Sequence, residues 1–193
     1  NLMKRLLAYL FLVLVLTFDF QSLTKADDIR DFEIEGMSIG DSALDFFSER
    51  EIKKNKKNWY KDKKFYGVEI KSKSEKFDSI QLHFKTGDNK YIINAVGGLV
   101  FFKNKIDKCH SLKKTVDKDI KNLFKNARIS EKGKRKHSGD KSGKSFTYDT
   151  YYYLKNGNVF SGCYDWSKKM RYTDNFRLIV NTKEINKWYS RAY

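Results

Sequence analysis

The two cysteines, Cys109 and Cys163, are open to two chemical interpretations. As a nucleophile, Cys109 would need a base within reach, and His110 follows it directly. Side chains adjacent in sequence rarely point into the same site, however, and no cysteine-protease signature surrounds either residue. In an oxidising compartment an even number of cysteines, here two, instead predicts one disulfide. That bond would tie the entry of a helix to a strand and, by closing a loop of about 55 residues, would stabilise the fold by on the order of 4 kcal/mol.

The segment 139–145, G-D-K-S-G-K-S, resembles a phosphate-binding loop. The true pattern needs a glycine, four residues, and then Gly-Lys-Ser/Thr. Here Ser138 stands five positions before Gly143, so the spacing is one residue short. No buried strand precedes the segment either. We interpret it as a flexible, solvated basic loop, with contact to a phosphorylated or carboxylated surface as the alternative.

Histidines and carboxylates offer no convergent site in the sequence. His83, His110 and His137 are scattered singly, without metal-ligand spacing. Asp149 within the tyrosine run and Asp165 beside Trp166 are expected to be cross-strand neighbours of aromatic residues and could form a carbohydrate-like platform of aromatic and carboxylate groups. Glycosidic chemistry, however, needs two carboxylates at a defined separation in a cleft. Surface polar positions are the preferred interpretation. The sequence therefore predicts no metal, no cofactor and no catalytic residue.

The segment 155–158, K-N-G-N, predicts a hairpin turn with Asn156 and Gly157 at its centre. This turn would set Tyr152 opposite Ser161, with the flanking pairs Leu154–Val159 and Thr150–Cys163. It would also lay Tyr151 over Gly162.

Side-chain alternation in this hairpin predicts two aromatic faces. The first carries Tyr148, Tyr152, Leu154, Val159 and Cys163. The second carries Tyr151, Tyr153, Phe160, Tyr164 and Trp166. One face must cover the core, and we predict that the second is a binding surface. The alternative is that helices or the other half of the chain cover both faces.

The first half of the chain shows helix, connector and strand patterns in that order. Asp41 is a predicted helix cap, with Leu44 and Phe47 on one helical side. A lysine-rich connector covers 53–64. Alternating runs then predict strands over 65–71, 79–85 and 91–102. Gly97-Gly98 inside the last run predicts a bulge or bend.

The second half repeats this plan. Helical spacing begins at Ser111, and a basic connector covers 125–144. Strand-like runs follow over 146–154, 159–166 and 175–181. A tail helix is expected after Thr182, with Ile185, Trp188 and Tyr189 packed inward. The predicted fold class is α+β, with two halves of about 27–108 and 109–193 that each combine a helix with an antiparallel meander. A diverged tandem repeat is one interpretation of this plan.

The N-terminal segment 1–26 has the layout of a secretory signal peptide. Met3 and two basic residues precede an apolar run, Leu6 to Phe18, and Ala26 stands at the cleavage position. The run holds about 13 residues, fewer than the roughly 20 of a membrane-spanning helix. We therefore expect residues 27–193 to form one exported domain, secreted or periplasmic, without a transmembrane span after cleavage. An uncleaved anchor is the alternative. The segment has no cysteine, so no lipid attachment is expected.

The formal charge of +16 suggests an anionic partner. The 40 basic residues are 32 Lys and 8 Arg, however, whereas specific phosphate or base recognition favours the arginine fork. Lys, Asn, Ile, Phe and Tyr are also the residues that an AT-rich genome over-produces. Genome composition therefore carries more weight than a dedicated polyanion site, and export argues against nucleic acid as a partner.

The most distinctive local sequence is 32–47, F-E-I-E-G-M-S-I-G-D-S-A-L-D-F-F. It resembles the opening of small secreted proteins of Pelagibacter-like marine alphaproteobacteria, and further similar stretches start at Gly98, Cys109, Asp140 and Cys163. The resemblance covers most of the chain after residue 26 and implies no activity. The helix-plus-meander plan also resembles the outer-membrane assembly lipoproteins of the BamE kind and the tandem β-lactamase-inhibitor fold. Lack of a lipidated cysteine departs from the lipoproteins, and fold alone does not define function.

Three functional hypotheses follow. The first is a non-enzymatic module that binds a protein or a cell-envelope component through sheet-surface aromatics and lysine-rich loops. The second is a small envelope hydrolase with an unrecognised set of Asp, His or Tyr. The third is electrostatic docking to an anionic envelope surface through the two basic connectors. The sequence leaves partner, substrate and oligomeric state open.

Overall fold

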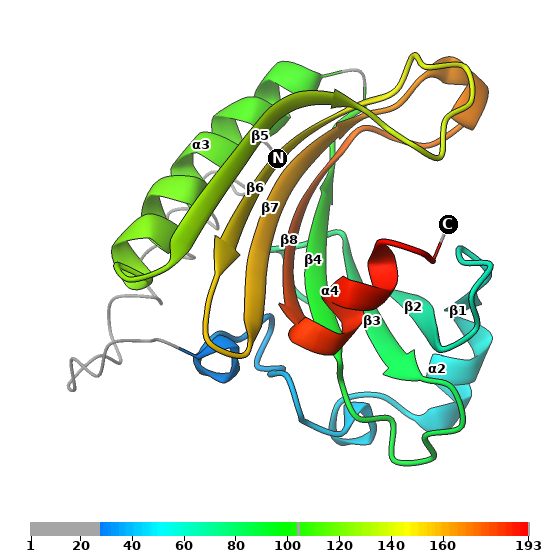
Figure 1. The fold of residues 1–193 in the computed structure, drawn as a ribbon. Helices are drawn as coiled ribbons and strands as arrows, with labels where there is room; N and C mark the ends of the chain where they lie inside the picture. The colour runs from blue at the N-terminus through cyan, green and yellow to red at the C-terminus, as the bar shows by residue number, and fades with distance from the viewer. Residues whose placement is uncertain (1–27, 104, 193) are drawn as a thin grey trace.

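Eight antiparallel strands form one continuous sheet in the part of the chain that the structure describes, residues 28–103 and 105–192 of a computed structural model (Figure 1). The predicted signal peptide, 1–26, lies outside the described residues. The strands are β1 (Lys56–Lys57), β2 (Phe65–Lys71), β3 (Ser79–Lys85), β4 (Ala95–Phe101), β5 (Arg128–Lys136), β6 (Phe146–Tyr153), β7 (Gly157–Asp165) and β8 (Asn175–Thr182). The helices are α2 (Glu49–Lys54), α3 (Ile106–Leu123) and α4 (Lys183–Tyr189), with 3-10 turns η1 (Ile29–Asp31), η2 (Ala43–Asp45) and η3 (Lys168–Met170). The fold is mixed α+β and mostly β.

The two predicted meanders join edge to edge in the order β1-β2-β3-β4-β8-β7-β6-β5. The junction is the β4–β8 pair, which runs in register from Ala95 opposite Asn181 to Phe101 opposite Asn175. All six predicted strands are present. Within the described residues, the sheet contains two further strands, β1 and β5, in segments that the sequence predicts to be connectors. The tandem repeat stays a prediction.

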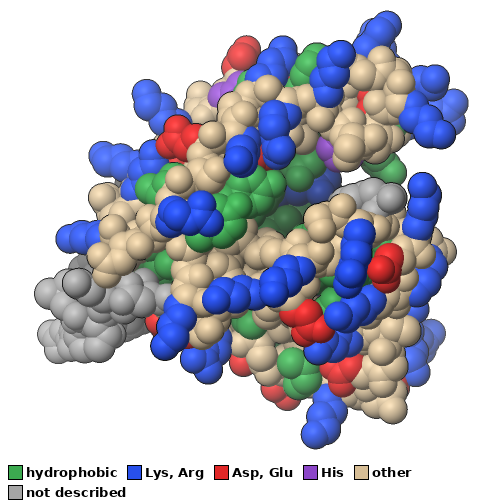
Figure 2. Space-filling model, viewed as in Figure 1, with side chains coloured by type: hydrophobic (Ala, Val, Ile, Leu, Met, Phe, Trp, Pro, Cys, Tyr) green, Lys and Arg blue, Asp and Glu red, His purple; other side chains and the backbone are tan. Residues whose placement is uncertain are grey.

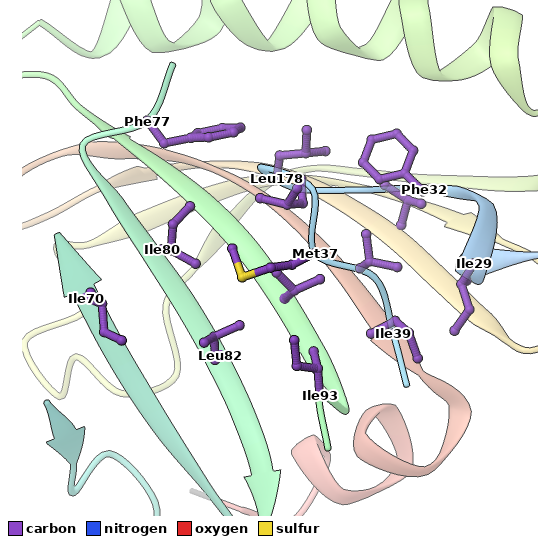
Figure 3. Packing of buried hydrophobic residues seen from close by; sticks show 14 of the residues in the cluster. Ile29, Phe32, Met37, Ile39, Ile70, Phe77, Ile80, Leu82, Ile93 and Leu178 are labelled. Carbon is purple, nitrogen blue, oxygen red and sulfur yellow. The ribbon is translucent and has the colours of Figure 1, made fainter. Parts of the chain in front are cut away.

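One face of the sheet, called here the α3 face, carries the main hydrophobic core. Helix α3 and the turn η1 lie on β7 and β8, and the segment that leads from η1 to η2 packs on the β2–β4 part of the same face (Figures 1 and 3). Phe32 and Met37 of that segment belong to one buried cluster with Leu178 of β8. Residues from both halves therefore share a single core.

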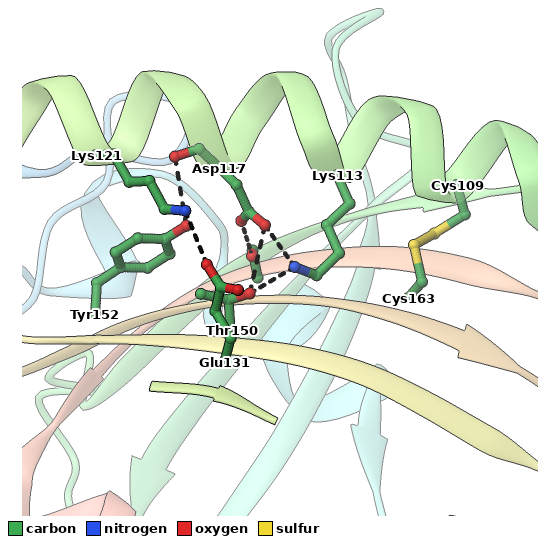
Figure 4. Close-up of polar contacts among 9 residues, drawn as sticks. Cys109, Lys113, Asp117, Lys121, Glu131, Thr150, Tyr152 and Cys163 are labelled. Atoms are coloured by element: carbon green, nitrogen blue, oxygen red, sulfur yellow. Dashed lines mark hydrogen bonds and ion pairs between the residues drawn. A yellow bond between two sulfur atoms is a disulfide. The ribbon is translucent and has the colours of Figure 1, made fainter. Parts of the chain in front are cut away.

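Helix α3 is held on this face by a disulfide and a partly buried polar cluster (Figure 4). Cys109 bonds Cys163 of β7, with their Cα atoms 5.9 Å apart, and neither cysteine is a free thiol. The Asp117 carboxylate accepts hydrogen bonds from the Lys113 ammonium and from the hydroxyls of Thr150 and Ser161. The predicted disulfide is therefore present, and the nucleophile interpretation does not hold.

The opposite face, called here the α4 face, carries the tail helix. Thr182 caps α4 by accepting a hydrogen bond from the backbone N–H of Ile185 at 3.2 Å. Ile185 and Trp188 are fully buried, and Tyr189 is half-buried, as predicted. The helix packs on β7 and β8, which leaves the β5–β6 side of this face open.

The first predicted helix is wrong in detail. Asp41 is not a helix cap, because its carboxylate turns back and accepts the backbone N–H of Ser38 at 2.8 Å. Ser42 caps the short turn η2, and Ser48 caps α2. Phe47 is buried as expected, but Leu44 is 43% exposed. Helix α3, in turn, starts at Ile106, ahead of the predicted Ser111.

Gly97 and Gly98 form no bulge, contrary to the prediction. Pairing with β3 and β8 passes through both residues without a shift. A Cβ on Gly98 would collide with the Phe77 ring, so this glycine admits a close ring contact. The irregularity lies in β5, between Glu131 and Gly133, where Gly133 has a φ of +59°.

The β6–β7 hairpin is shifted by two residues from the predicted register. Tyr152 lies opposite Val159, and Tyr148 lies opposite Cys163. Gly157 is not at the centre of the turn because it pairs with Thr182 of β8, where a Cβ would meet the Asn181 carbonyl oxygen. Because the shift is even, both predicted faces keep their members.

Gly162 also differs from the prediction. The Phe160 ring, not Tyr151, lies over it, and Asp149 is its partner on β6.

Candidate functional site

The five residues of the predicted binding face form a continuous aromatic row on the α4 face. Ring centroids are 6.1 Å apart between Tyr153 and Tyr151, and 5.1 Å apart between Tyr151 and Phe160. The row continues at 6.5 Å from Phe160 to Tyr164 and at 5.6 Å from Tyr164 to Trp166. It runs diagonally across β6 and β7. The name "aromatic row" is kept for these five residues below.

The aromatic row is only partly covered. Phe160 is buried in a cluster with Ile179 of β8 and with Ile185 and Trp188 of α4. The other four members are half-buried. Figure 2 looks onto this face, where apolar side chains line a hollow and Lys and Arg surround it. The alternative that helices cover both faces therefore holds for Phe160 and fails for the other four members of the row.

Three arginines from two strands contact the aromatic row. The guanidinium carbon of Arg128 lies 4.1 Å from the ring centre of Tyr153, and that of Arg177 lies 4.0 Å from the ring centre of Tyr164. Arg135 forms an ion pair with the buried Asp149. None of these arginines is predicted from the sequence, because their positions depend on pairing with distant strands.

Arg177 lies in the middle of the α4 face. Its neighbours across the strands are Leu99 and Gly162, and the Phe160 ring lies over Gly162. Its Nε donates a hydrogen bond to Asn175 Oδ1 at 2.8 Å. Among the described residues no carboxylate forms an ion pair with Arg177.

Asp149 and Arg135 form an ion pair beneath the row. Asp149 is 4% exposed, and its carboxylate also accepts a hydrogen bond from Thr147 at 3.0 Å. Burial, and then the neighbouring Asp149 carboxylate, raise the pKa of Tyr151. The Tyr151 phenol therefore stays protonated at neutral pH and remains a hydrogen-bond donor. The other Asp149 oxygen, Oδ1, has no hydrogen-bond partner among the described residues.

Loops 137–145 and 166–174 lie side by side (Figure 1), and Ser167 joins them by donating hydrogen bonds to Ser145 and Asp140. The two loops form a cationic lobe that begins at Trp166. Asp140 is 5% exposed and accepts hydrogen bonds from the hydroxyls of Ser145 at 2.6 Å and Ser167 at 2.8 Å. Hydrogen bonds from these serines and from Ser142 hold the pKa of Asp140 below its ordinary value. The segment that resembles a phosphate loop is thus tied internally by its carboxylate, not solvated throughout as predicted.

The lobe is strongly basic once the end of β5 is included. Segments 132–145 and 166–174 contain nine basic residues and two acidic ones, a formal charge of +7. All nine basic residues are exposed, whereas Asp140 is buried and Asp174 is half-buried. Of the nine, only Arg135 forms an ion pair within the described residues. In the other basic connector, Lys53 and Lys64 are paired with glutamates. The two connectors therefore differ in how far their basic side chains are neutralised by ion pairs.

The histidines lie apart. His83 is 2% exposed beneath Tyr60, whose hydroxyl lies 2.8 Å from its Nε2, and burial, with a smaller effect of Arg177, lowers its pKa to about 3. His137 contacts the Trp166 ring at 4.6 Å, and burial followed by Arg177 lowers its pKa. His110 packs on the α3 face. No group of three metal-binding side chains converges anywhere in 28–103 or 105–192.

Two surface cavities flank the β5–β6 side of the sheet. One, of about 450 Å³, lies at the Tyr153 end of the aromatic row and is also lined by Arg128, Lys183 and Lys187. The other, of about 660 Å³, lies between α3 and β5 on the α3 face, where Lys113 and Asp117 already bind each other. The first cavity extends the row, and no acidic side chain lines it.

Comparisons with protein-family models, with curated proteins and with solved structures give no match for this chain. No helix among residues 28–103 and 105–192 is long and apolar enough to cross a bilayer.

Proposed function

We propose that this chain is an exported, non-enzymatic binding module whose α4 face takes a protein or another component of the cell envelope. The observation that carries the proposal is the half-open aromatic row with arginines on its rings. The same hairpin has a second face that is closed by a helix and a disulfide, so the open face is not needed to form the core.

Physical chemistry supports this assignment. Tyrosine, tryptophan and arginine are enriched at the centres of protein interfaces, because they bury a large area and keep a polar group for orientation. The four half-buried members of the row and the three arginines combine these types in one patch. A disulfide between buried cysteines suits the oxidising compartment that an exported protein enters.

The test replaces three members of the row at once, as Tyr151→Ala, Tyr153→Ala and Trp166→Ala. Capture of envelope partners by this variant should be lost, while its far-ultraviolet circular dichroism matches the wild type. The matched control is Tyr66→Ala with Tyr148→Ala, two half-buried tyrosines of the α3 face, which should capture the same partners as the wild type. An unchanged capture profile for the row variant would refute the proposal.

A further inference from the structure

Arginine is used selectively along the aromatic row. The chain has 32 Lys and 8 Arg, yet among the described residues three arginines contact the row and no lysine lies over one of its rings. The lysines that lie over aromatic rings do so elsewhere, at Phe47, Phe65, Tyr66, Phe146 and Tyr148. A genome bias toward lysine does not produce this distribution. The guanidinium group differs from an ammonium in its planar fork, which binds a carboxylate through two parallel hydrogen bonds.

We propose, resting on the proposed function above, that the ligand of the α4 face is an acidic, extended polypeptide segment. Its carboxylates are bound by the guanidinium forks of Arg128 and Arg177. Arg135 is not a third anchor, because it neutralises Asp149 and bonds the Tyr151 hydroxyl. The buried negative charge under the row is thereby compensated within the protein, and an incoming carboxylate does not meet it unpaired.

The two anchors have a spacing that an extended chain matches. Arg128 is on β5 and Arg177 is on β8, three strand spacings away and four residues along the strand direction. With strands about 4.8 Å apart and a rise of about 3.3 Å per residue, the two positions are about 20 Å apart. An extended peptide covers that distance with about six residues. Tyr153, Tyr151 and Phe160 lie between the two anchors, and Tyr164 and Trp166 continue the row beyond Arg177.

Positive charge extends beyond both anchors. At the Arg128 end, Lys183 and Lys187 line the cavity of about 450 Å³. At the Arg177 end, the cationic lobe carries its exposed basic residues. A ligand with acidic residues toward both ends would therefore be attracted along its whole length, and the lobe would speed its encounter with the row.

Ring orientation favours a peptide over an acidic sugar chain. The Tyr151 and Tyr153 rings are inclined by only 14° to each other, and the Tyr164 and Trp166 rings by 29°. These residues stand next to each other on one face of a strand, so their ring faces turn toward one another. The Arg128 and Arg177 guanidinium groups occupy a further ring face at each end. A sugar ring stacks on an open ring face, whereas a peptide can use ring edges and the phenol hydroxyls.

The experiment measures binding of a fluorescein-labelled hexapeptide of glutamates, with the glutamine hexapeptide as its uncharged control, at physiological ionic strength. The key variant is Arg128→Lys with Arg177→Lys, which keeps the net charge and removes both forks. The matched control is Arg50→Lys with Arg191→Lys, two exposed arginines away from the row. We expect affinity to fall about tenfold per anchor, the worth of one charge-assisted hydrogen bond, and to stay unchanged in the control.

Three outcomes would overturn the inference. They are equal binding by the anchor variant and the wild type, equal binding of the glutamate and glutamine peptides, and stronger binding of a polygalacturonate chain that depends on the same two arginines. The triple variant Tyr151→Ala, Tyr153→Ala and Trp166→Ala separates the two proposals. If it loses envelope capture while the anchor variant binds normally, the acidic-peptide inference fails and the binding function stands. If it captures partners normally, the proposed function fails.

Discussion

The two faces of the β6–β7 hairpin use similar residues for different purposes. On the α3 face, Tyr152, Val159 and Cys163 are fully buried, and a helix is bonded to the strand beneath it. On the α4 face, Tyr151 and Tyr164 remain half-exposed, with arginines on or beside their rings. Adjacent tyrosines thus have opposite environments because strand alternation assigns them to opposite faces. The α3 face holds the fold together, and the α4 face is left available for a ligand.

This contrast predicts that changes on the α3 face reduce stability and that changes on the open row reduce binding. The largest loss should follow removal of the disulfide by Cys109→Ser with Cys163→Ser. Because the bond closes a long loop, the free energy of unfolding should fall by about 4 kcal/mol. Urea denaturation of the oxidised wild type and of the variant measures this difference. A loss below about 1 kcal/mol would show that α3 is held by its other contacts.

The next largest loss of stability should come from the partly buried polar cluster under α3. Asp117→Ala removes the carboxylate that accepts hydrogen bonds from Lys113 and Ser161 and leaves the lysine charge without its partner. The free energy of unfolding should fall by about 3 kcal/mol. Asp107→Ala, an exposed acid on the same helix, is the control and should change stability by less than about 1 kcal/mol. Equal losses in both variants would mean that the cluster contributes no more than surface charge.

A pH-dependent loss of stability should come from His83, which is buried on the α4 face. Its pKa is lowered to about 3 in the folded state, from an ordinary value near 6.5. Between these values the unfolded chain binds a proton that the folded chain does not, so stability is complete above about pH 6.5 and falls as the pH falls. From pH 7 to pH 5 the loss should be about 2 kcal/mol.

Urea denaturation across that pH range, compared with His83→Gln, provides the measurement. The variant should lose most of the pH dependence, and His137→Gln should lose less. A wild-type stability that is flat from pH 7 to pH 5 would contradict the burial of a neutral His83.

The smallest stability effect should come from the open row. Tyr151→Ala removes a half-buried ring with two ring neighbours, and the free energy of unfolding should fall by about 1 kcal/mol. Tyr152→Ala, one residue along and fully buried, should lose several times more. Thermal unfolding of the two variants side by side gives the comparison. Equal losses would mean that the α4 face is part of the core.

The alternation of apolar and polar residues was sufficient to predict the six main strands and both faces of the hairpin. A register error of two residues keeps every side chain on its predicted face. The register itself was not predictable from the turn. Asn156-Gly157 has the composition of a hairpin turn, but Gly157 is required by the close approach of β8, a strand that lies further along the chain.

Strand β5 and the arginine anchors were missed for related reasons. Arg128–Lys136 is exposed on both sides, so no apolar period marks it as a strand, and its edge position tolerates the charges that made it look like a connector. Arg177 gains its place over Tyr164 only through the β7–β8 pairing. A local signal did exist, because arginine is scarce in this lysine-rich chain.

The central claim is that the α4 face contacts a partner in the cell envelope, and cross-linking in living cells tests it most directly. A photoreactive benzoylphenylalanine at Tyr153, in the aromatic row, is compared with the same group at Leu44, which is 43% exposed outside the row. The account predicts a discrete cross-linked product at Tyr153 that disappears when Tyr151 and Trp166 are also replaced by alanine, and no product at Leu44. A product at Leu44 with none at Tyr153 would contradict it.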